Sequence, residues 1–157
     1  MGKTERIALV DTHCIDEVLL NDLLKTQISG IDRFTDASRA LDALKQAEYR
    51  AILLSLSIDS GTMPEFAGTH DHSTYDLGVP TRLIRQLRAY GSANKDTPII
   101  VADHVHEKKD PHAPNASSHV IAAGANRYVN LIESAYPGLA KIIQYHLAPR
   151  ALASRNL

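Results

Sequence analysis

The sequence predicts an α/β fold, in which one parallel sheet of five strands is covered by helices on both faces. Short apolar runs alternate five times with segments whose apolar residues recur at helical spacing. The run from Tyr49 to Leu56 is nearly continuous in apolar residues, as expected for a central parallel strand that is buried on both faces. Parallel neighbours need crossover connections, so this alternation favours a single doubly wound sheet.

Two strand and helix pairs precede that central strand. Residues 6–11 form an apolar run that ends in Asp11, and residues 14–27 carry apolar side chains on one helical stripe. Residues 31–34 predict a weak second strand. Asp36 then suits the N-cap of a second helix.

The second half of the chain repeats the pattern but contains two connections longer than is usual in α/β proteins. In chain order, we expect an irregular stretch over 57–78, a helix over 79–90, a strand over 97–102, a second long loop over 103–115, a helix over 116–123, a strand over 126–130 and a last helix from Pro137 to about His146.

Composition indicates one domain, which we place at residues 5–148, with a C-terminal tail at 149–157. The chain has 157 residues, 44% hydrophobic and 22% charged, and a net charge of −1. This near balance gives no field that would attract nucleic acid or an anionic membrane. The single cysteine, Cys14, excludes an intrachain disulfide, and the charged N-terminus has no long apolar segment after it, so we expect a cytoplasmic protein.

Four segments then suggest a family. The segments "RIALVD", "FTDASRALDALKQAEYRAILLSLSID", "TPIIVAD" and "AAGANRYVN" occur in an order and at spacings that need only two insertions. In these segments the chain resembles the CheY-like receiver domain of two-component response regulators, over roughly residues 5–148. The resemblance implies a flavodoxin-like (βα)5 fold and a role in a bacterial phosphorelay.

The resemblance also implies where the family's phosphorylation site would fall. The acid pair that binds magnesium corresponds to Asp11 and Thr12, and the aspartate that accepts the phosphoryl group corresponds to Ser55. The remaining matches are the hydroxyl residue at Asp103, the lysine at Asn130 or Leu131, and the switch aromatic at Tyr128. Of these positions, only Asp11 and Tyr128 retain the family's residue type.

A serine at the acceptor position argues against aspartyl phosphorylation. Receivers need a carboxylate nucleophile and nearby cations, whereas Ser55 has no evident base and the lysine is missing. The resemblance therefore implies a degenerate, or pseudo-receiver, domain that is not an enzyme and acts through a protein partner or a homodimer. An alternative is that Asp59 serves as a displaced acceptor.

Histidines suggest a second class of function. Seven of the eight lie in the predicted loops after three strands or at the start of the adjoining helices. Imidazole suits zinc, copper, nickel or iron. We expect no obligatory cofactor, but the loops offer candidate ligands for a metal or small-ligand sensor: His13, His70, His72, His104, His106 and His112.

Overall fold

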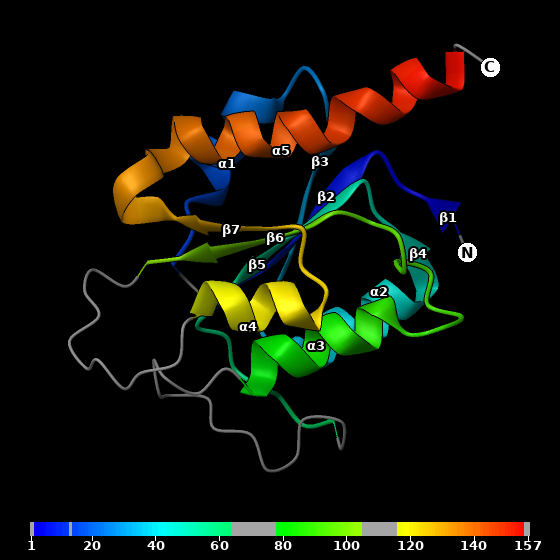
Figure 1. Cartoon of the computed structure of the whole chain (residues 1–157), viewed down its shortest axis with the longest axis vertical. Coiled ribbons are helices and arrows are strands. Elements are labelled where there is room, and N and C mark those ends of the chain that lie inside the picture. The colour runs from blue at the N-terminus through cyan, green and yellow to red at the C-terminus, as the bar shows by residue number, and fades with distance from the viewer. Residues whose placement is uncertain (1, 13, 64–77, 105–115, 156–157) are drawn as a thin grey trace.

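The computed structural model describes residues 2–12, 14–63, 78–104 and 116–155. Its centre is a parallel sheet of five strands in the order β3-β2-β5-β6-β7 (Figure 1). These strands are β2 (Arg6–Val10), β3 (Gly30–Phe34), β5 (Ala51–Ser55), β6 (Ile99–Asp103) and β7 (Arg127–Asn130). β2 pairs with β3 on one side and with β5 on the other, so the chain order reverses at β2. The sheet is therefore doubly wound, as predicted.

Helices cover both faces of this sheet. Figure 1 shows α1 (Glu17–Leu24) and α5 (Leu131–Arg155) on one side, and α2 (Ala37–Gln46), α3 (Gly78–Arg88) and α4 (Ala116–Ala123) on the other. The three-layer α/β fold with five parallel strands is therefore confirmed.

Aspartate side chains fix where two of the helices begin. The Asp16 carboxylate accepts a hydrogen bond from the Leu19 amide, and the Asp36 carboxylate accepts one from the Arg39 amide. Each satisfies an amide of the first turn that has no partner within the helix. The first helix thus starts at Glu17, three residues later than the apolar pattern suggested.

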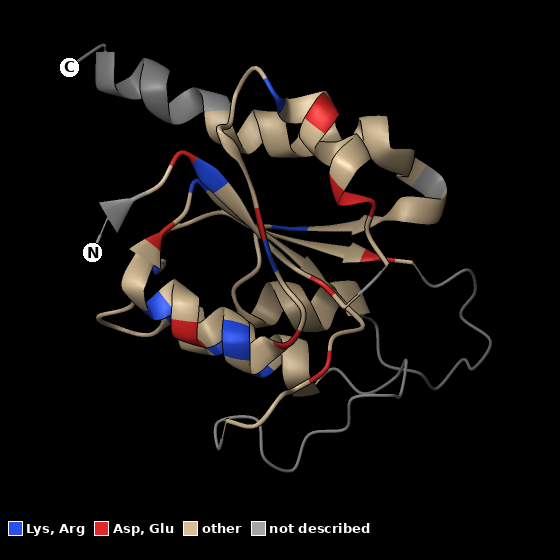
Figure 2. Ribbon diagram, turned by 180° about the vertical axis from the view of Figure 1, so that it is seen from behind, with Lys and Arg blue, Asp and Glu red and all other residues tan. Residues whose placement is uncertain are grey.

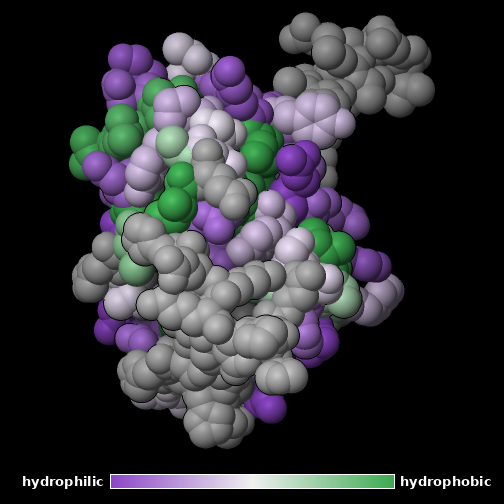
Figure 3. Space-filling model, turned by 60° about the vertical axis from the view of Figure 1, so that its left-hand side comes forward, coloured by the Kyte–Doolittle hydropathy of each residue, from purple (hydrophilic) through white to green (hydrophobic). Residues whose placement is uncertain are grey.

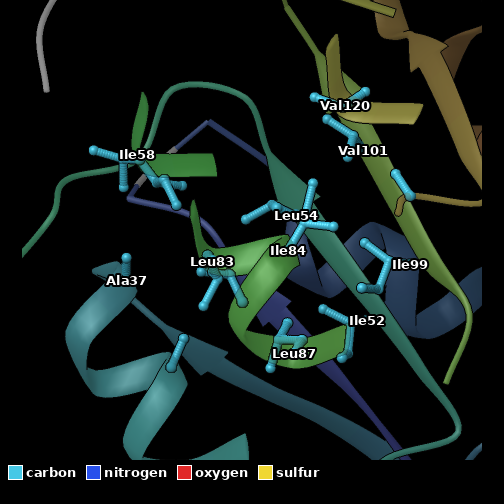
Figure 4. Close-up of a cluster of buried hydrophobic side chains, with 14 of the residues drawn as sticks. Ala37, Ile52, Leu54, Ile58, Leu83, Ile84, Leu87, Ile99, Val101 and Val120 are labelled. Atoms are coloured by element: carbon cyan, nitrogen blue, oxygen red, sulfur yellow. The ribbon is translucent and has the colours of Figure 1, made fainter. Parts of the chain in front are cut away.

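Two apolar clusters lie against the two faces of the sheet. Ile52, Leu54, Ile99 and Val101 face α2, α3 and α4, where Leu83, Ile84 and Leu87 pack on them (Figure 4). The alternate residues of the same strands face α1 and α5, for example Leu53 and Ile100. This alternation follows from the period of two along a strand, and it explains why the central strand is apolar throughout.

Two elements differ from the sequence-based expectations. A small second sheet pairs β1 (Gly2–Lys3) with β4 (Ala47–Glu48) in parallel. The last helix continues to Arg155, through most of the segment predicted as a tail, and it is interrupted at Ala135, where φ is 55°. In the described parts of the chain, no helix is long and apolar enough to cross a membrane.

Tyr49, which precedes β5, predicts a stability change at high pH. Its hydroxyl donates to Asp32 at 2.7 Å, and burial followed by this hydrogen bond raises the pKa of Tyr49 from 10.0 to about 12. The folded state therefore favours the neutral phenol, and its contribution is complete below pH 10 and is lost as the pH rises toward 12. We expect this loss to be about 2 kcal/mol and to be absent in Tyr49→Phe.

Urea unfolding of both proteins across this pH range measures the difference. Tyr90→Phe is the matched control, because Tyr90 is 96% exposed. An equal fall in stability in the wild type and Tyr49→Phe would contradict the assignment.

Candidate functional site

The predicted site residues lie along the carboxyl edge of the sheet. Asp11 follows β2, Ser55 ends β5, Asp103 ends β6 and Asn130 ends β7. Ser55 is in register with Ala102, and Asp103 is in register with Asn130. Ligands of open parallel sheets bind at such an edge, so this is the candidate site.

Asp11 is buried and already has a counter-charge. Its Oδ2 accepts hydrogen bonds from the Ile15 amide at 2.8 Å and from Arg33 Nη2 at 2.5 Å. Its other oxygen, Oδ1, has no hydrogen-bond partner among the described residues. Arg33 lies on β3 and was missed by sequence reasoning, because only the strand register places it beside Asp11.

The second residue of the expected acid pair makes a structural contact. Thr12 donates its hydroxyl to the Thr35 carbonyl oxygen at 3.3 Å, between the chain segments that follow β2 and β3. Thr12 thus contributes a hydroxyl where the resemblance places a carboxylate. The position therefore has one carboxylate, that of Asp11, where the resemblance places two.

Ser55 is the last residue of the central strand and is 3% exposed. The strand does not extend to Asp59, whose backbone instead pairs with Asp36 and accepts a hydrogen bond from the Ala37 amide at 2.8 Å. Asp59 therefore lies over the start of α2, four residues beyond the strand end. This placement does not support the alternative that Asp59 serves as a displaced phosphoryl acceptor.

Asp103 has a partner that sequence reasoning did not predict. The Tyr128 hydroxyl donates a short hydrogen bond to Asp103 Oδ2. Asp103 is 6% exposed, and the Tyr128 ring packs against the apolar cluster on the α2, α3 and α4 side of the sheet. Tyr128, predicted as the switch aromatic, is thereby hydrogen-bonded to Asp103, which the resemblance places at the position of the family's hydroxyl residue.

Neither candidate for the lysine position carries a charge. The Asn130 side chain accepts a hydrogen bond from the Ile132 amide at 2.9 Å, as a capping residue does at a helix start. Leu131 is buried in the cluster beneath α1 and α5. Both residues therefore have structural roles at the junction of β7 and α5.

These residues do not fit a magnesium site. Magnesium requires near-octahedral oxygen ligands. Among the described edge residues, Asp11 has Oδ2 bound to a guanidinium and leaves only Oδ1 open, Thr12 bonds to backbone, and Ser55 offers a neutral hydroxyl. Asp103, which could add a carboxylate, is bonded to Tyr128 instead.

The histidine hypothesis concerns mainly residues outside those that the structure describes: His13, His70, His72, His106 and His112. Of the proposed ligands only His104 is described, and its Nε2 lies 3.1 Å from the Cys14 carbonyl oxygen. No group of three potential metal ligands occurs within the described ranges. A transition-metal site in the two long loops remains a prediction.

Comparison with known proteins identifies the class of fold. The chain is similar to a response regulator from Hahella chejuensis, with 19% identity, 92% of this chain and 96% of the other covered, and a TM-score of 0.64. It is similar to the chemotaxis response regulator CheY4 of Vibrio cholerae, with 15% identity, coverage of 90% and 98%, and a TM-score of 0.63.

A third similar structure is the receiver domain of a sensor histidine kinase from Pseudomonas aeruginosa, which has a magnesium ion coordinated in its active-site cleft. Here the identity is 17%, the coverage is 90% of this chain and 96% of the other, and the TM-score is 0.57. No protein-family model and no curated protein sequence matches the chain. The structural likeness establishes the CheY-like receiver fold over most of the chain, as the sequence predicted.

Proposed function

We propose that this protein is a degenerate receiver domain that signals by binding a protein partner without phosphorylation of an aspartate. The observation that carries the proposal is Ser55, a nearly buried serine at the end of the central strand. A serine there cannot form the acyl phosphate that a carboxylate forms.

The surrounding charges support the same conclusion. Transfer of a phosphoryl group needs cations that stabilise the charge on its oxygens. At this edge the Arg33 guanidinium is already paired with Asp11, and neither Asn130 nor Leu131 is basic. The proposed role is therefore a binding role in a bacterial signalling pathway and not a catalytic one.

The contact between Tyr128 and Asp103 supports a constitutive output. In the receivers that this chain resembles, the switch aromatic responds to movement of a hydroxyl residue. Here the Tyr128 hydroxyl is held by a carboxylate that is itself buried. This bond favours one position of the ring, so partner binding would not depend on a chemical signal at the edge.

Exposed apolar side chains offer surface for a partner or a second copy. In Figure 3, hydrophobic side chains reach the surface in the upper part of the molecule, which contains α1 and α5 in Figure 1. The large exposed apolar residues of these helices are Val18, Leu19, Ile132 and Tyr145, with exposures of 80%, 41%, 49% and 65%. Single exposed apolar side chains are common on protein surfaces, so these four residues supply contact area for the proposed cytoplasmic partner but do not by themselves mark the binding face.

Incubation with acetyl phosphate and magnesium tests the proposal. We expect no gain of a phosphoryl group in the intact mass, because the carboxylate nucleophile is missing. An active receiver domain, treated in the same tube, is the positive control. A hydroxylamine-sensitive phosphoryl group on any aspartate of this protein would overturn the proposal.

A further inference from the structure

Arg33 makes more contacts with the β2–α1 connection than a surface ion pair requires. Its Nη2 donates to Asp11 Oδ2 at 2.5 Å and to the Ile15 carbonyl oxygen at 3.0 Å, and its Nε lies 3.5 Å from the Asp11 carbonyl oxygen. Glu17 lies 4.0 Å from Nη1. One guanidinium therefore contacts three residues before and at the start of α1: Asp11, Ile15 and Glu17.

Strand register explains how Arg33 reaches this place. Leu9 of β2 pairs with Arg33 of β3, and paired residues of neighbouring strands project to the same face. Asp11 comes two positions after Leu9 and so continues on that face, beneath α1. In Figure 2, basic and acidic segments are interspersed along the strands, and neither sign is confined to one layer.

The Asp11 carboxylate needs a cation in this environment. Its side chain is fully buried, and a buried charge without a partner is strongly unfavourable. The Arg33 side chain is 25% exposed and supplies a permanent positive charge in direct contact with it. A divalent ion at the same carboxylate would find only Oδ1 open, because Oδ2 is bound by two donors, and it would be repelled by the guanidinium.

We propose that Arg33 is a resident counter-cation that takes the place of a divalent ion at Asp11 and holds the β2–α1 connection in a metal-independent conformation. This inference goes beyond the proposed function, because it concerns the inorganic chemistry of the edge and not partner binding.

The same contacts extend to the last helix. Arg33 binds the Ile15 carbonyl oxygen, and the next residue, Asp16, donates its amide to the Tyr136 hydroxyl at 2.8 Å. Tyr136 lies on α5, which packs against α1. Loss of the guanidinium should therefore loosen the α1–α5 junction as well as expose the carboxylate.

The substitution Arg33→Met separates the charge from the bulk of the side chain. We expect the wild-type melting temperature to be independent of added MgCl2 or MnCl2. Arg33→Met should melt at a lower temperature in metal-free buffer, recover part of the loss with MgCl2, and bind Mn²⁺ about tenfold or more tightly than the wild type by electron paramagnetic resonance. Arg39→Met is the matched control, because the Arg39 side chain is 75% exposed in its pair with Asp36.

Two further variants keep the test decisive. Arg33→Met combined with Asp11→Asn should neither bind Mn²⁺ nor respond to MgCl2, because no charge remains to be balanced. If Arg33→Met does not fold, Arg33→Lys retains the charge and should remain insensitive to the metals.

Tight Mn²⁺ binding by the wild type, or an Arg33→Met protein that folds but gains no response to either metal, would overturn the proposal. A response in Arg33→Lys equal to that of Arg33→Met would do the same. The metal titrations contain no phosphoryl donor, so their outcome bears on Arg33 alone, whereas aspartyl phosphorylation of the wild type by acetyl phosphate would contradict the proposed function.

Discussion

Replacement of Asn94 by alanine is expected to lower the free energy of unfolding by about 4 kcal/mol, because it removes hydrogen bonds from several buried groups at once. Asn94 is fully buried. Its amide nitrogen donates to the carbonyl oxygens of Leu44 and Ala47 at 2.7 and 2.8 Å. Its carbonyl oxygen accepts from the Tyr49 amide at 2.9 Å and from the Thr97 hydroxyl at 3.0 Å.

These bonds join the end of α2 to the starts of β5 and β6. Urea unfolding followed by circular dichroism measures the loss. Lys95→Ala is the matched control, because its side chain is exposed on the same turn and contacts only the exposed Tyr90 ring among the interactions described, so it should cost less than about 1 kcal/mol. Equal stability of Asn94→Ala and Lys95→Ala would show that Asn94 does not hold this junction.

Arg88→Met is expected to destabilise the fold by about 3 kcal/mol, because charge-assisted hydrogen bonds to four backbone carbonyl groups are lost, most of them partly buried. Its Nη1 donates to the carbonyl oxygens of Asn94, Lys95 and Thr97, and its Nε donates to that of Gly124 at 2.9 Å. The last contact requires glycine: at φ of 123°, an added Cβ would lie 2.7 Å from Arg88 Cγ.

Arg85 tests whether this effect belongs to the position or to the residue type. Arg85 lies one turn earlier on α3 and is exposed, so Arg85→Met should leave the melting temperature nearly unchanged. Arg88→Met should lower it by about 8 °C or more. A similar small change in both variants would refute the proposed role of Arg88.

Both predicted effects concern the amino edge of the sheet, opposite the candidate site. Asn94 and Thr97 precede β6, and Tyr49 precedes β5, whereas Asp11, Ser55 and Asp103 follow the strands. Variants at Asn94 or Arg88 can therefore report on stability without changing the residues of the carboxyl edge. This separation allows a loss of partner binding to be attributed to the edge when the melting temperature is unchanged.

Much of the fold could be predicted because local pattern and burial agree. The unbroken apolar run of the central strand indicated burial on both faces, and Asp36 marked the start of α2 correctly. The predicted helix at 116–123 coincides with α4. The extension of α5 to Arg155 and the small β1–β4 sheet were not predicted, because the apolar residues in these segments do not recur clearly at helical or strand spacing.

The site was only partly predictable. Ser55 and Asp103 lie at the carboxyl edge as expected, because each ends an apolar run that forms a parallel strand; their register with Ala102 and Asn130 came from the structure. The partners of Asp11 and Asp103 did not follow, since Arg33 is 22 residues from Asp11 and Tyr128 is 25 residues from Asp103.

The sequence by itself determined the alternation of strands and helices and the absence of an acid at the end of the central strand, because both depend on residue types at fixed spacing along the chain. Only the tertiary structure decided which charges are balanced at the carboxyl edge. Pairing of separate strands brings Arg33 to Asp11 and Tyr128 to Asp103, and such contacts depend on register and face, which no local pattern contains.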